Sequence, residues 1–204
     1  MKTKLITTLV TIAAASTALF AADSPAVGTK APDFSLTDSK GKTQSVSQYK
    51  GKYVVLEWFN PECPFVKKHY GSGNMQKVQE EFTKKGIVWL TIDSSAPGLE
   101  GHLTSDQANA KMTEWKTKQT ALVLDPDGKA GQAYGAKNTP HMFVINPEGK
   151  IIYEGAIDSK ATPNASDIAS STNYVKIALD ESLAGKPVSK ANTKPYGCSV
   201  KYEK

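Results

Sequence analysis

Arginine is absent from this 204-residue sequence, and all 25 of its basic residues are lysine. A lysine supplies the charge of an arginine but not the forked geometry with which a guanidinium binds two oxygens at once. Cysteine is scarce as well, because only Cys63 and Cys198 are present. A chain of this length can build a hydrophobic core without disulfide staples, so the two thiols need another explanation.

Long apolar runs are also missing beyond the N-terminal segment. No later stretch approaches the length of about 20 apolar residues that a membrane span requires. The lysines are scattered along the chain, and removal of Lys2 and Lys4 would lower the formal net charge of +5 to about +3. This distribution lacks the clustered basic surface of nucleic-acid-binding proteins, so we expect no nucleic-acid partner.

Residues 1–21 have the features of a secretory signal peptide. Lys2 and Lys4 precede an apolar run at residues 5–20, and Ala21 and Ala22 stand just before the first acidic residue. This pattern predicts cleavage after Ala21 or Ala22, a periplasmic or secreted mature protein, and no stable membrane insertion after cleavage. Residues 19–21 depart from the usual small-x-small cleavage pattern, which leaves an uncleaved or lipid-associated form as the alternative.

The remaining residues have the length of a single domain at residues 22–186, followed by a tail at residues 187–204. Apolar, β-branched and aromatic runs predict strands at residues 53–59, 87–93, 121–125, 141–145 and 150–154, the last two forming a hairpin. Helical spacing predicts helices at residues 64–70, 74–85, 105–118, 129–134 and 172–183.

Three further features complete the predicted outline. Residues 34–37 and 43–46 form a hairpin, Ser105 is the N-cap of its helix, and residues 94–101 and 158–171 are loops. The order of strands and helices indicates an α/β sandwich with a mixed central sheet.

Cys63 has the local context of an activated nucleophile. It follows a buried strand and precedes Pro64, and proline is well accommodated at the first position of a helix. The free N–H groups and the positive end of the helix dipole then favour the thiolate and lower the pKa of the cysteine. The alternative is an inert buried thiol, because free cysteine is often fully buried.

The segment VVLEWFNPECP at residues 54–64 resembles the strand and redox-active turn of the thioredoxin superfamily, particularly its exported redoxin members. Residues 31–36 (APDFSL) and 50–55 (KGKYVV) resemble the N-terminal hairpin of the alkyl hydroperoxide reductase and thiol-specific antioxidant branch. Thr139 and Pro140, followed by a strand and a turn, are similar to the cis-proline loop and closing hairpin of the superfamily.

The resemblance implies a thioredoxin-like three-layer sandwich with a mixed central sheet and an N-terminal β-hairpin. It places Thr139 and a cis Pro140 beside the sulfur of Cys63. We therefore expect a substrate to contact Pro64, Thr139 and Pro140. Trp58 and Phe59 flank the site as core or rim aromatics, and we expect Trp58 to belong to the substrate-binding set.

The second cysteine of thioredoxins, three residues after the first, is replaced here by Val66. Cys198 is the one thiol that can take its place as the resolving cysteine, and a peroxiredoxin-like subgroup has a similar C-terminal Gly-Cys segment. Cys198 could instead form a structural staple, worth up to about 5 kcal/mol for so long a loop, or pair with another chain. We favour an intramolecular pair of Cys63 and Cys198, because an exported chain meets an oxidising compartment.

The positions that define an efficient peroxidase differ in this chain. A peroxiredoxin has Thr or Ser three residues before its reactive cysteine and Pro seven residues before it, with an arginine holding the thiolate and the peroxide. Here these positions are Asn60 and Leu56, and no arginine exists. Peroxidase activity is therefore the weaker alternative.

Metal binding is not expected. His69 follows Cys63 by six residues, a spacing that places the two side chains on different faces of a helix. His141 follows Pro140 and could approach the sulfur, but scattered histidines are usually surface residues. By the same argument we interpret Lys67 and Lys68 as a solvated helix face.

Two functions are consistent with these observations. The first is an exported thiol–disulfide oxidoreductase that needs no cofactor, acts on a protein or small-molecule thiol or disulfide, and uses Cys63 as nucleophile and Cys198 as resolving thiol. The second is a non-catalytic thioredoxin-fold binding module whose two cysteines form a permanent structural disulfide.

Overall fold

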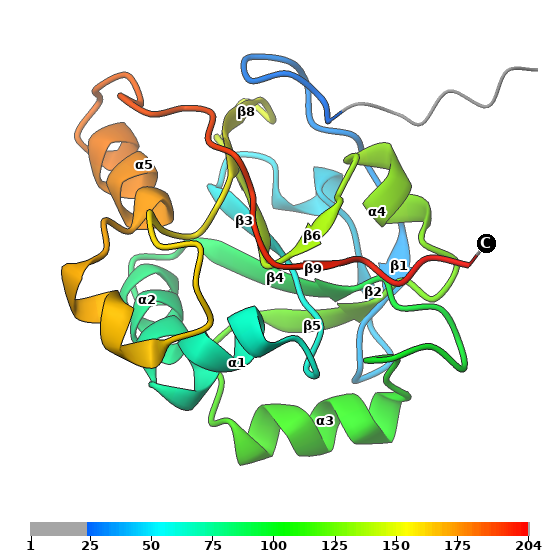
Figure 1. Cartoon of the computed structure of the whole chain (residues 1–204). Helices are drawn as coiled ribbons and strands as arrows, with labels where there is room; N and C mark the ends of the chain where they lie inside the picture. The colour runs from blue at the N-terminus through cyan, green and yellow to red at the C-terminus, as the bar shows by residue number, and fades with distance from the viewer. Residues whose placement is uncertain (1–23, 204) are drawn as a thin grey trace, which may run out of the picture.

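A mixed five-stranded sheet lies at the centre of the computed structural model, which describes residues 24–203 (Figure 1). In sheet order its strands are β5 (Ala121–Leu124), β4 (Val88–Asp93), β3 (Val54–Trp58), β7 (His141–Ile145) and β8 (Ile151–Gly155). Strands β4 and β5 run parallel to β3, whereas β7 is antiparallel to β3 and β8 to β7. The predicted signal peptide, residues 1–21, lies outside the described residues.

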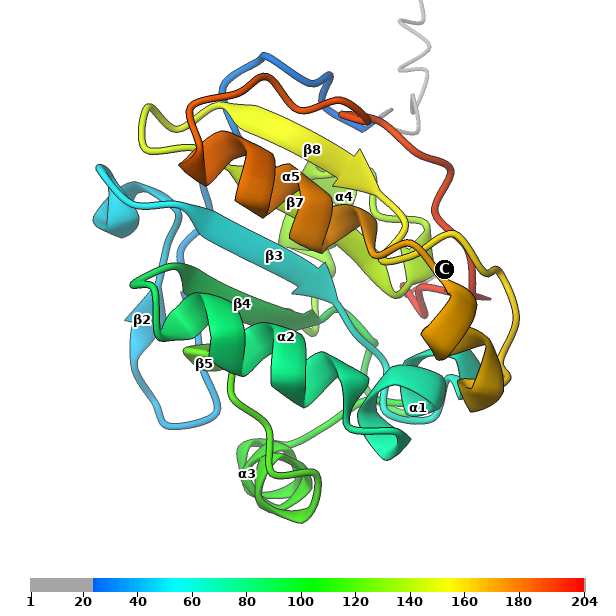
Figure 2. The ribbon, with the colours of Figure 1, turned by 90° about the vertical axis from the view of Figure 1, so that its left-hand side faces the viewer.

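Helices cover both faces of this sheet, as the predicted three-layer sandwich requires (Figure 2). One face carries α1 (Pro64–Gly71), α2 (Asn74–Thr83) and α5 (Tyr174–Leu183). The other face carries α4 (Lys129–Ala133) and the turn η1 (Ser47–Tyr49), and α3 (Ser105–Glu114) lies beside the edge strand β5. Among residues 24–203 we find no helix with the length and apolar character of a membrane span.

Alternating side chains of the strands divide the core into two clusters, one on each side of the sheet. Val55 and Trp89 face α1, α2 and α5, and Cys63 is part of this cluster. Leu56, Trp58 and their neighbours face α4 on the opposite side. This division follows from the period of two in a strand, and it explains why β3 is buried along its whole length.

Some predicted details were wrong, and the helix predicted at residues 105–118 ends at Glu114. The N-cap of α3 is Thr104 rather than Ser105: its hydroxyl accepts from the N–H of Gln107, and the Gln107 side chain accepts from the N–H of Thr104 in return. This capping box satisfies the backbone N–H groups of both Thr104 and Gln107. The predicted loop at residues 158–171 contains a short 3-10 helix, η2 (Ala165–Ser170).

Both edges of the sheet are covered. The hairpin of β1 (Leu36–Thr37) and β2 (Thr43–Gln44) pairs with the β5 edge through Asp38. At the other edge, Asn192 of the tail forms a parallel bridge with Glu154 of β8. Coverage of this kind removes the free backbone groups that make exposed sheet edges prone to aggregation.

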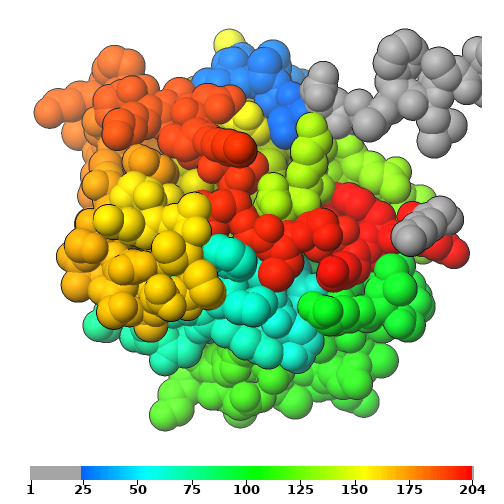
Figure 3. All heavy atoms as spheres, viewed as in Figure 1, coloured from blue at the N-terminus to red at the C-terminus, as the bar shows by residue number. Residues whose placement is uncertain are grey.

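The tail then crosses the carboxyl end of β3 as an extended segment, which we call the C-terminal strap (residues 187–203). It forms β9 (Cys198–Ser199), which pairs antiparallel with β6 (Asn138–Thr139). In Figure 3 the strap, in red, lies across the face of the molecule above the start of α1. Residues 187–203 are thus part of the folded domain.

Candidate functional site

Cys63 occupies the N-cap position of α1, and Pro64 is the first helical residue, as the sequence predicted. The turn before it is held by Asn60, whose side chain accepts from the N–H of Glu62 at 2.8 Å and donates to the carbonyl of Glu100 at 2.9 Å. Asn60 is only 1% exposed. The residue that replaces the expected Thr or Ser therefore has a structural task, which is to join the Cys63 turn to the loop after β4.

Three chain segments meet at the sulfur of Cys63. The thiol donates a hydrogen bond to the carbonyl oxygen of Thr139 at 3.1 Å. Thr139 precedes a cis Pro140 and pairs directly with Cys198 across β6 and β9. The side chains of Cys63 and Cys198 are in hydrogen-bonding contact, and both cysteines are free thiols in this structure. Pairing in the strap has thus brought the second thiol to the first.

The two thiols have opposite acidities. Burial by itself raises the pKa of Cys63, but hydrogen bonds from the Cys198 side chain and from the backbone of Val66 and Cys198 outweigh burial and lower it. Burial, together with the hydrogen bond to Cys63 and its charge, raises the pKa of Cys198 to about 12. Cys63 therefore ionises first, and Cys198 keeps its proton and shares it with the Cys63 thiolate.

Access to the sulfur of Cys63 is closed in this conformation. Cys63 has 0% exposure, whereas Cys198 is half-buried and Pro64 is exposed. Thr139 and Pro140 are buried beneath the strap. The structure thus assembles Cys63, Thr139 and Cys198 but leaves only Pro64 and part of Cys198 at the surface.

Trp58 requires a correction, because it is fully buried in the core cluster on the other side of the sheet. It packs edge-on against Phe143 with ring centroids 5.3 Å apart, and its indole N–H donates to the Ser94 hydroxyl at 3.1 Å. Alternation along β3 turns Trp58 away from the face that carries Cys63. It therefore supports the sheet beneath the site and is not available for substrate contact in this conformation.

The two predicted surface histidines are buried as well. His69 and His141 are 0% and 1% exposed. His141 pairs with Trp58 in the sheet and stacks on Phe143 with centroids 4.6 Å apart, so it lies on the face opposite Cys63. Within the described part of the chain, no group of three or more His, Cys, Asp or Glu side chains is arranged to hold a metal ion.

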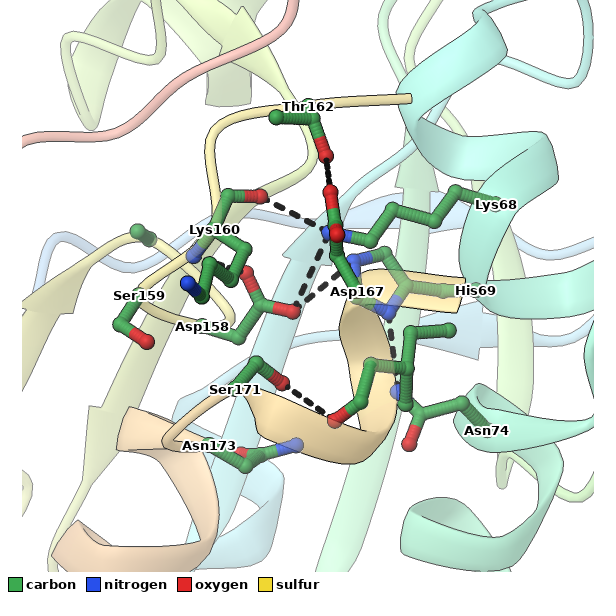
Figure 4. A network of polar contacts seen from close by, with 12 residues as sticks. Lys68, His69, Asn74, Asp158, Ser159, Lys160, Thr162, Asp167, Ser171 and Asn173 are labelled. Carbon is green, nitrogen blue, oxygen red and sulfur yellow. Dashed lines mark hydrogen bonds and ion pairs between the residues drawn. The ribbon is translucent and has the colours of Figure 1, made fainter. Parts of the chain in front are cut away.

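Lys68, which was interpreted as part of a solvated face, is 3% exposed and belongs to a buried polar cluster (Figure 4). Its ammonium lies 3.3 Å from the Asp158 carboxylate and donates to the carbonyl of Lys160 at 2.8 Å. His69 Nδ1 accepts from the Asn74 amide at 2.8 Å, so its proton lies on Nε2, toward Asp158. Burial lowers the pKa of His69 to about 4, so the ring is neutral at pH 7.

Tyr196 connects this cluster to the strap. Its hydroxyl donates to the Asp158 carboxylate and lies 3.4 Å from His69 Nε2. Its ring packs against Phe65 with centroids 5.8 Å apart. The sequence alone did not predict this link, although Tyr196, an aromatic residue two positions before Cys198, was a visible signal.

Glu57 is a second buried group that was not predicted from the sequence. It is fully buried in β3, and its carboxyl accepts from the Trp89 indole at 2.8 Å and from the Tyr70 hydroxyl at 2.9 Å, with Thr91 and Gln79 close by. Burial outweighs these hydrogen bonds and raises the pKa of Glu57 to about 7. The only charged residue in an otherwise apolar strand was the signal that could have identified it.

Comparison of the sequence with known protein families identifies the family of the chain. Residues 27–154 match the model of the AhpC/TSA family. The thiol-disulfide oxidoreductase ResA of Bacillus subtilis is 31% identical over 127 residues, which cover 61% of this chain and 64% of ResA. This alignment therefore spans just under two thirds of that relative.

Two solved structures share the fold over most of their length. A hypothetical protein of Sinorhizobium meliloti has a TM-score of 0.75 and 22% identity, covering 89% of this chain and 97% of its own. An uncharacterized conserved protein of Geobacillus kaustophilus has a TM-score of 0.74 and 23% identity, covering 87% and 93%.

The family match includes the Cys63 turn and the segment of Thr139 and Pro140, but it ends before Cys198. The chain is homologous to thiol-disulfide oxidoreductases through this shared part. Because the family model matches residues 27–154, more than half of the sequence, the chain belongs to the AhpC/TSA family.

Proposed function

We propose that this protein is a thiol–disulfide oxidoreductase in which Cys63 is the nucleophile and Cys198 the resolving thiol. The observation that carries the proposal is the contact between the two thiols at the N-terminus of α1, with a lowered pKa for one and a raised pKa for the other. Homology to thiol-disulfide oxidoreductases such as ResA supports the same chemistry.

The reaction begins with the Cys63 thiolate. It attacks one sulfur of a substrate disulfide, the substrate S–S bond breaks, and the departing thiolate takes a proton from solvent. This step leaves a mixed disulfide between Cys63 and the other half of the substrate. The Cys198 thiol and the amide of Val66 favour the attacking thiolate before the bond forms.

Formation of the mixed disulfide removes the negative charge of Cys63. The hydrogen bond to Cys63 and its charge are two of the causes that raise the pKa of Cys198, so both disappear at this point. Cys198 then loses its proton to solvent and attacks the Cys63 sulfur, the second half of the substrate leaves as a thiolate, and the Cys63–Cys198 disulfide forms. The substrate has gained two electrons and the protein has lost two.

The same contacts serve exchange in the reverse direction, because each step is reversible. The substrate class is a protein or small-molecule disulfide or thiol. We also propose that the mature protein acts in the periplasm or outside the cell after removal of residues 1–21. Mass spectrometry of the natively expressed protein tests the cleavage, because it distinguishes a chain that begins at residue 22 or 23 from the full-length chain.

Two variants test the assignment of the cysteines. Cys63→Ser should abolish reduction of insulin or of glutathione disulfide, whereas Cys198→Ser should stop after the first step and accumulate a mixed disulfide that mass spectrometry detects on Cys63. Turnover that survives Cys63→Ser would refute the nucleophile assignment. A Cys198→Ser variant that turns over at the parent rate would refute the resolving role.

The complete burial of Cys63 favours one competing function, a binding module with a permanent disulfide. The two functions differ in reduction potential, because a structural disulfide has a potential below about −300 mV and a catalytic one lies higher. Equilibration of the protein with glutathione mixtures measures this potential. We expect a value above that limit, and a value below it would support the structural role instead.

A further inference from the structure

Two tyrosine side chains hold the strap, one on each side of Cys198. Tyr196, two residues before Cys198, donates its hydroxyl proton to Asp158. Tyr202, four residues after Cys198, donates to the carbonyl of Ala136 at 2.7 Å. The Tyr202 ring lies against Gly131, where a Cβ atom would overlap it. Cys198 therefore lies between two tyrosines whose hydroxyl groups are hydrogen-bonded to the body of the domain.

The anchor for Tyr196 is built on the helix that begins at Cys63. Asp158 is held by the ammonium of Lys68 on α1 and accepts from the N–H of Lys160 at 2.9 Å (Figure 4). Because Asp158 has these buried partners, it cannot follow Tyr196 if the strap moves. The hydroxyl of Tyr196 thus ties the second thiol to the same element that positions the first.

Between the anchors, the strap fits closely on Thr139. Gly197 has a φ of 121°, and a Cβ atom there would overlap the carbonyl oxygen of Thr139. That oxygen is also the acceptor of the Cys63 thiol. Only glycine allows the strap to approach close enough for Cys198 to reach Cys63.

The closed strap has two opposite consequences for the exchange reaction. It covers Cys63, which has 0% exposure, so an external disulfide reaches the sulfur only after the strap has left Thr139. It also presents Cys198 to Cys63, so its return sets the rate of the second, intramolecular step. The same anchor therefore slows the first step and speeds the second.

We propose that Tyr196 is a positioning residue of this site: through its hydrogen bond to Asp158 it holds the strap closed, shields Cys63 from external disulfides and delivers Cys198 to the mixed disulfide. This inference rests on the proposed function, because it takes Cys198 as the resolving thiol. A hydrogen bond to a charged group changes an equilibrium constant by roughly 10- to 100-fold. Loss of the Tyr196 hydroxyl should shift the balance between open and closed strap by such a factor.

The reduced full-length mature protein and the chromogenic disulfide DTNB provide the test. Attack by Cys63 releases one thionitrobenzoate anion and leaves the other on Cys63 as a mixed disulfide. Attack by Cys198 on the Cys63 sulfur forms the protein disulfide and releases the second anion. Stopped-flow absorbance resolves the two releases in time, so the two steps are measured in one experiment.

Tyr196→Phe should accelerate the first release and slow the second, each by about tenfold or more. The matched control is Tyr53→Phe, which removes a hydroxyl that donates to the carbonyl of Ser182 at the amino end of β3, whereas Cys63 follows its carboxyl end. It should change neither rate. Opposite changes in the two steps distinguish positioning from a loss of stability, because a loosened fold would expose both thiols and accelerate the first release without a selective loss of the second.

A second pair of variants tests the strap without altering its polar anchor. Gly197→Ala should have the same two effects, because the added methyl pushes the strap away from Thr139. Gly185→Ala is its control: Gly185 also has a positive φ, of 70°, but a Cβ atom there has nothing within 4 Å. If Tyr196→Phe and Gly197→Ala both release two anions at the rates of the parent protein, the positioning role of Tyr196 is wrong, while the resolving role of Cys198 stands. Release of a single anion by the parent protein would instead refute Cys198 as the resolving thiol.

Discussion

Substitution of Glu57 by glutamine should change how the stability of the protein depends on pH. In the folded protein, Glu57 Oε2 accepts from Trp89, Gln79 and Thr91, whereas Oε1 faces the Tyr70 hydroxyl. A protonated Glu57 can donate from Oε1 to the Tyr70 oxygen, and a glutamine amide can do the same. Glu57→Gln is therefore a close mimic of the neutral acid, and it cannot ionise.

The size of this change in the free energy of unfolding follows from the pKa of Glu57, which burial raises from 4.5 to about 7. The folded protein holds this proton more tightly than the unfolded chain, so the resulting stability is fully present below pH 4.5 and is lost as the pH rises toward and past 7. Each pKa unit corresponds to about 1.4 kcal/mol, so the loss is about 3 kcal/mol. For a domain of this size, that loss lowers the melting temperature by roughly 6–12 °C.

Other buried groups titrate in the same range, so the parent protein alone cannot reveal the effect. Burial lowers the pKa of His69 from 6.5 to about 4, and this group adds stability as the pH rises through that interval. Burial raises the pKa of Asp93 from 3.8 to about 6, and this group removes stability as the pH rises. The difference between parent and Glu57→Gln cancels both contributions and isolates Glu57.

Urea unfolding followed by tryptophan fluorescence at several pH values between 4 and 8 measures this difference. We expect Glu57→Gln to gain about 3 kcal/mol relative to the parent between these limits. Asp93→Asn is the matched comparison, and its gain should occur about one pH unit lower because the pKa of Asp93 is raised to about 6. A difference between parent and Glu57→Gln that stays constant from pH 4 to 8 would show that the buried carboxyl keeps an ordinary acidity, and the reasoning would be wrong.

Three further outcomes are expected. Lys68→Met should lower the free energy of unfolding by about 3–5 kcal/mol in urea titrations, because it leaves the buried Asp158 without its cation; a loss below 1 kcal/mol would contradict a structural ion pair. Cys198→Ala should raise the pKa of Cys63, as measured by ultraviolet titration of the thiolate, because the hydrogen bond from Cys198 is lost. Cys198→Ser should raise this pKa less, because serine still supplies a hydroxyl donor. An unchanged pKa of Cys63 in both variants would exclude the hydrogen bond from Cys198. Hydrogen peroxide should oxidise Cys63 at the slow rate of an ordinary thiolate, because each missing preorganised donor costs about 10²–10³ in rate; a fast, saturable stopped-flow reaction that Cys63→Ser removes would establish a peroxidase.

Local patterns in the sequence were sufficient to predict the strand and the helix on either side of Cys63. The apolar run before Cys63 predicted a buried strand, and Pro64 predicted a helix start; the structure has β3 at Val54–Trp58 and α1 from Pro64. Both signals are local, because strand burial and the constraint on proline depend on a few neighbouring residues. The family resemblance added the cis peptide bond before Pro140, which base rates alone would not predict.

Errors arose where a polar residue has its partner far away in the sequence. Lys68 was interpreted as solvated, yet its carboxylate partner Asp158 lies 90 residues further on. His69 was expected at the surface for the same reason and is buried between Asn74 and Tyr196. Charged and polar side chains are usually exposed unless a specific partner compensates the loss of water, and sequence spacing does not reveal that partner.

The sequence by itself therefore determined the fold class, the family and the position of Cys63 at the start of a helix, because each depends on short patterns of residues. Only the tertiary structure decided what surrounds that thiol: the strap that pairs Cys198 with Thr139, the tyrosine anchors on either side of it, and the burial of Trp58 on the opposite face. These features depend on contacts between segments that are distant in the chain. Such contacts form only when the folded sheet brings its edges and its last residues together.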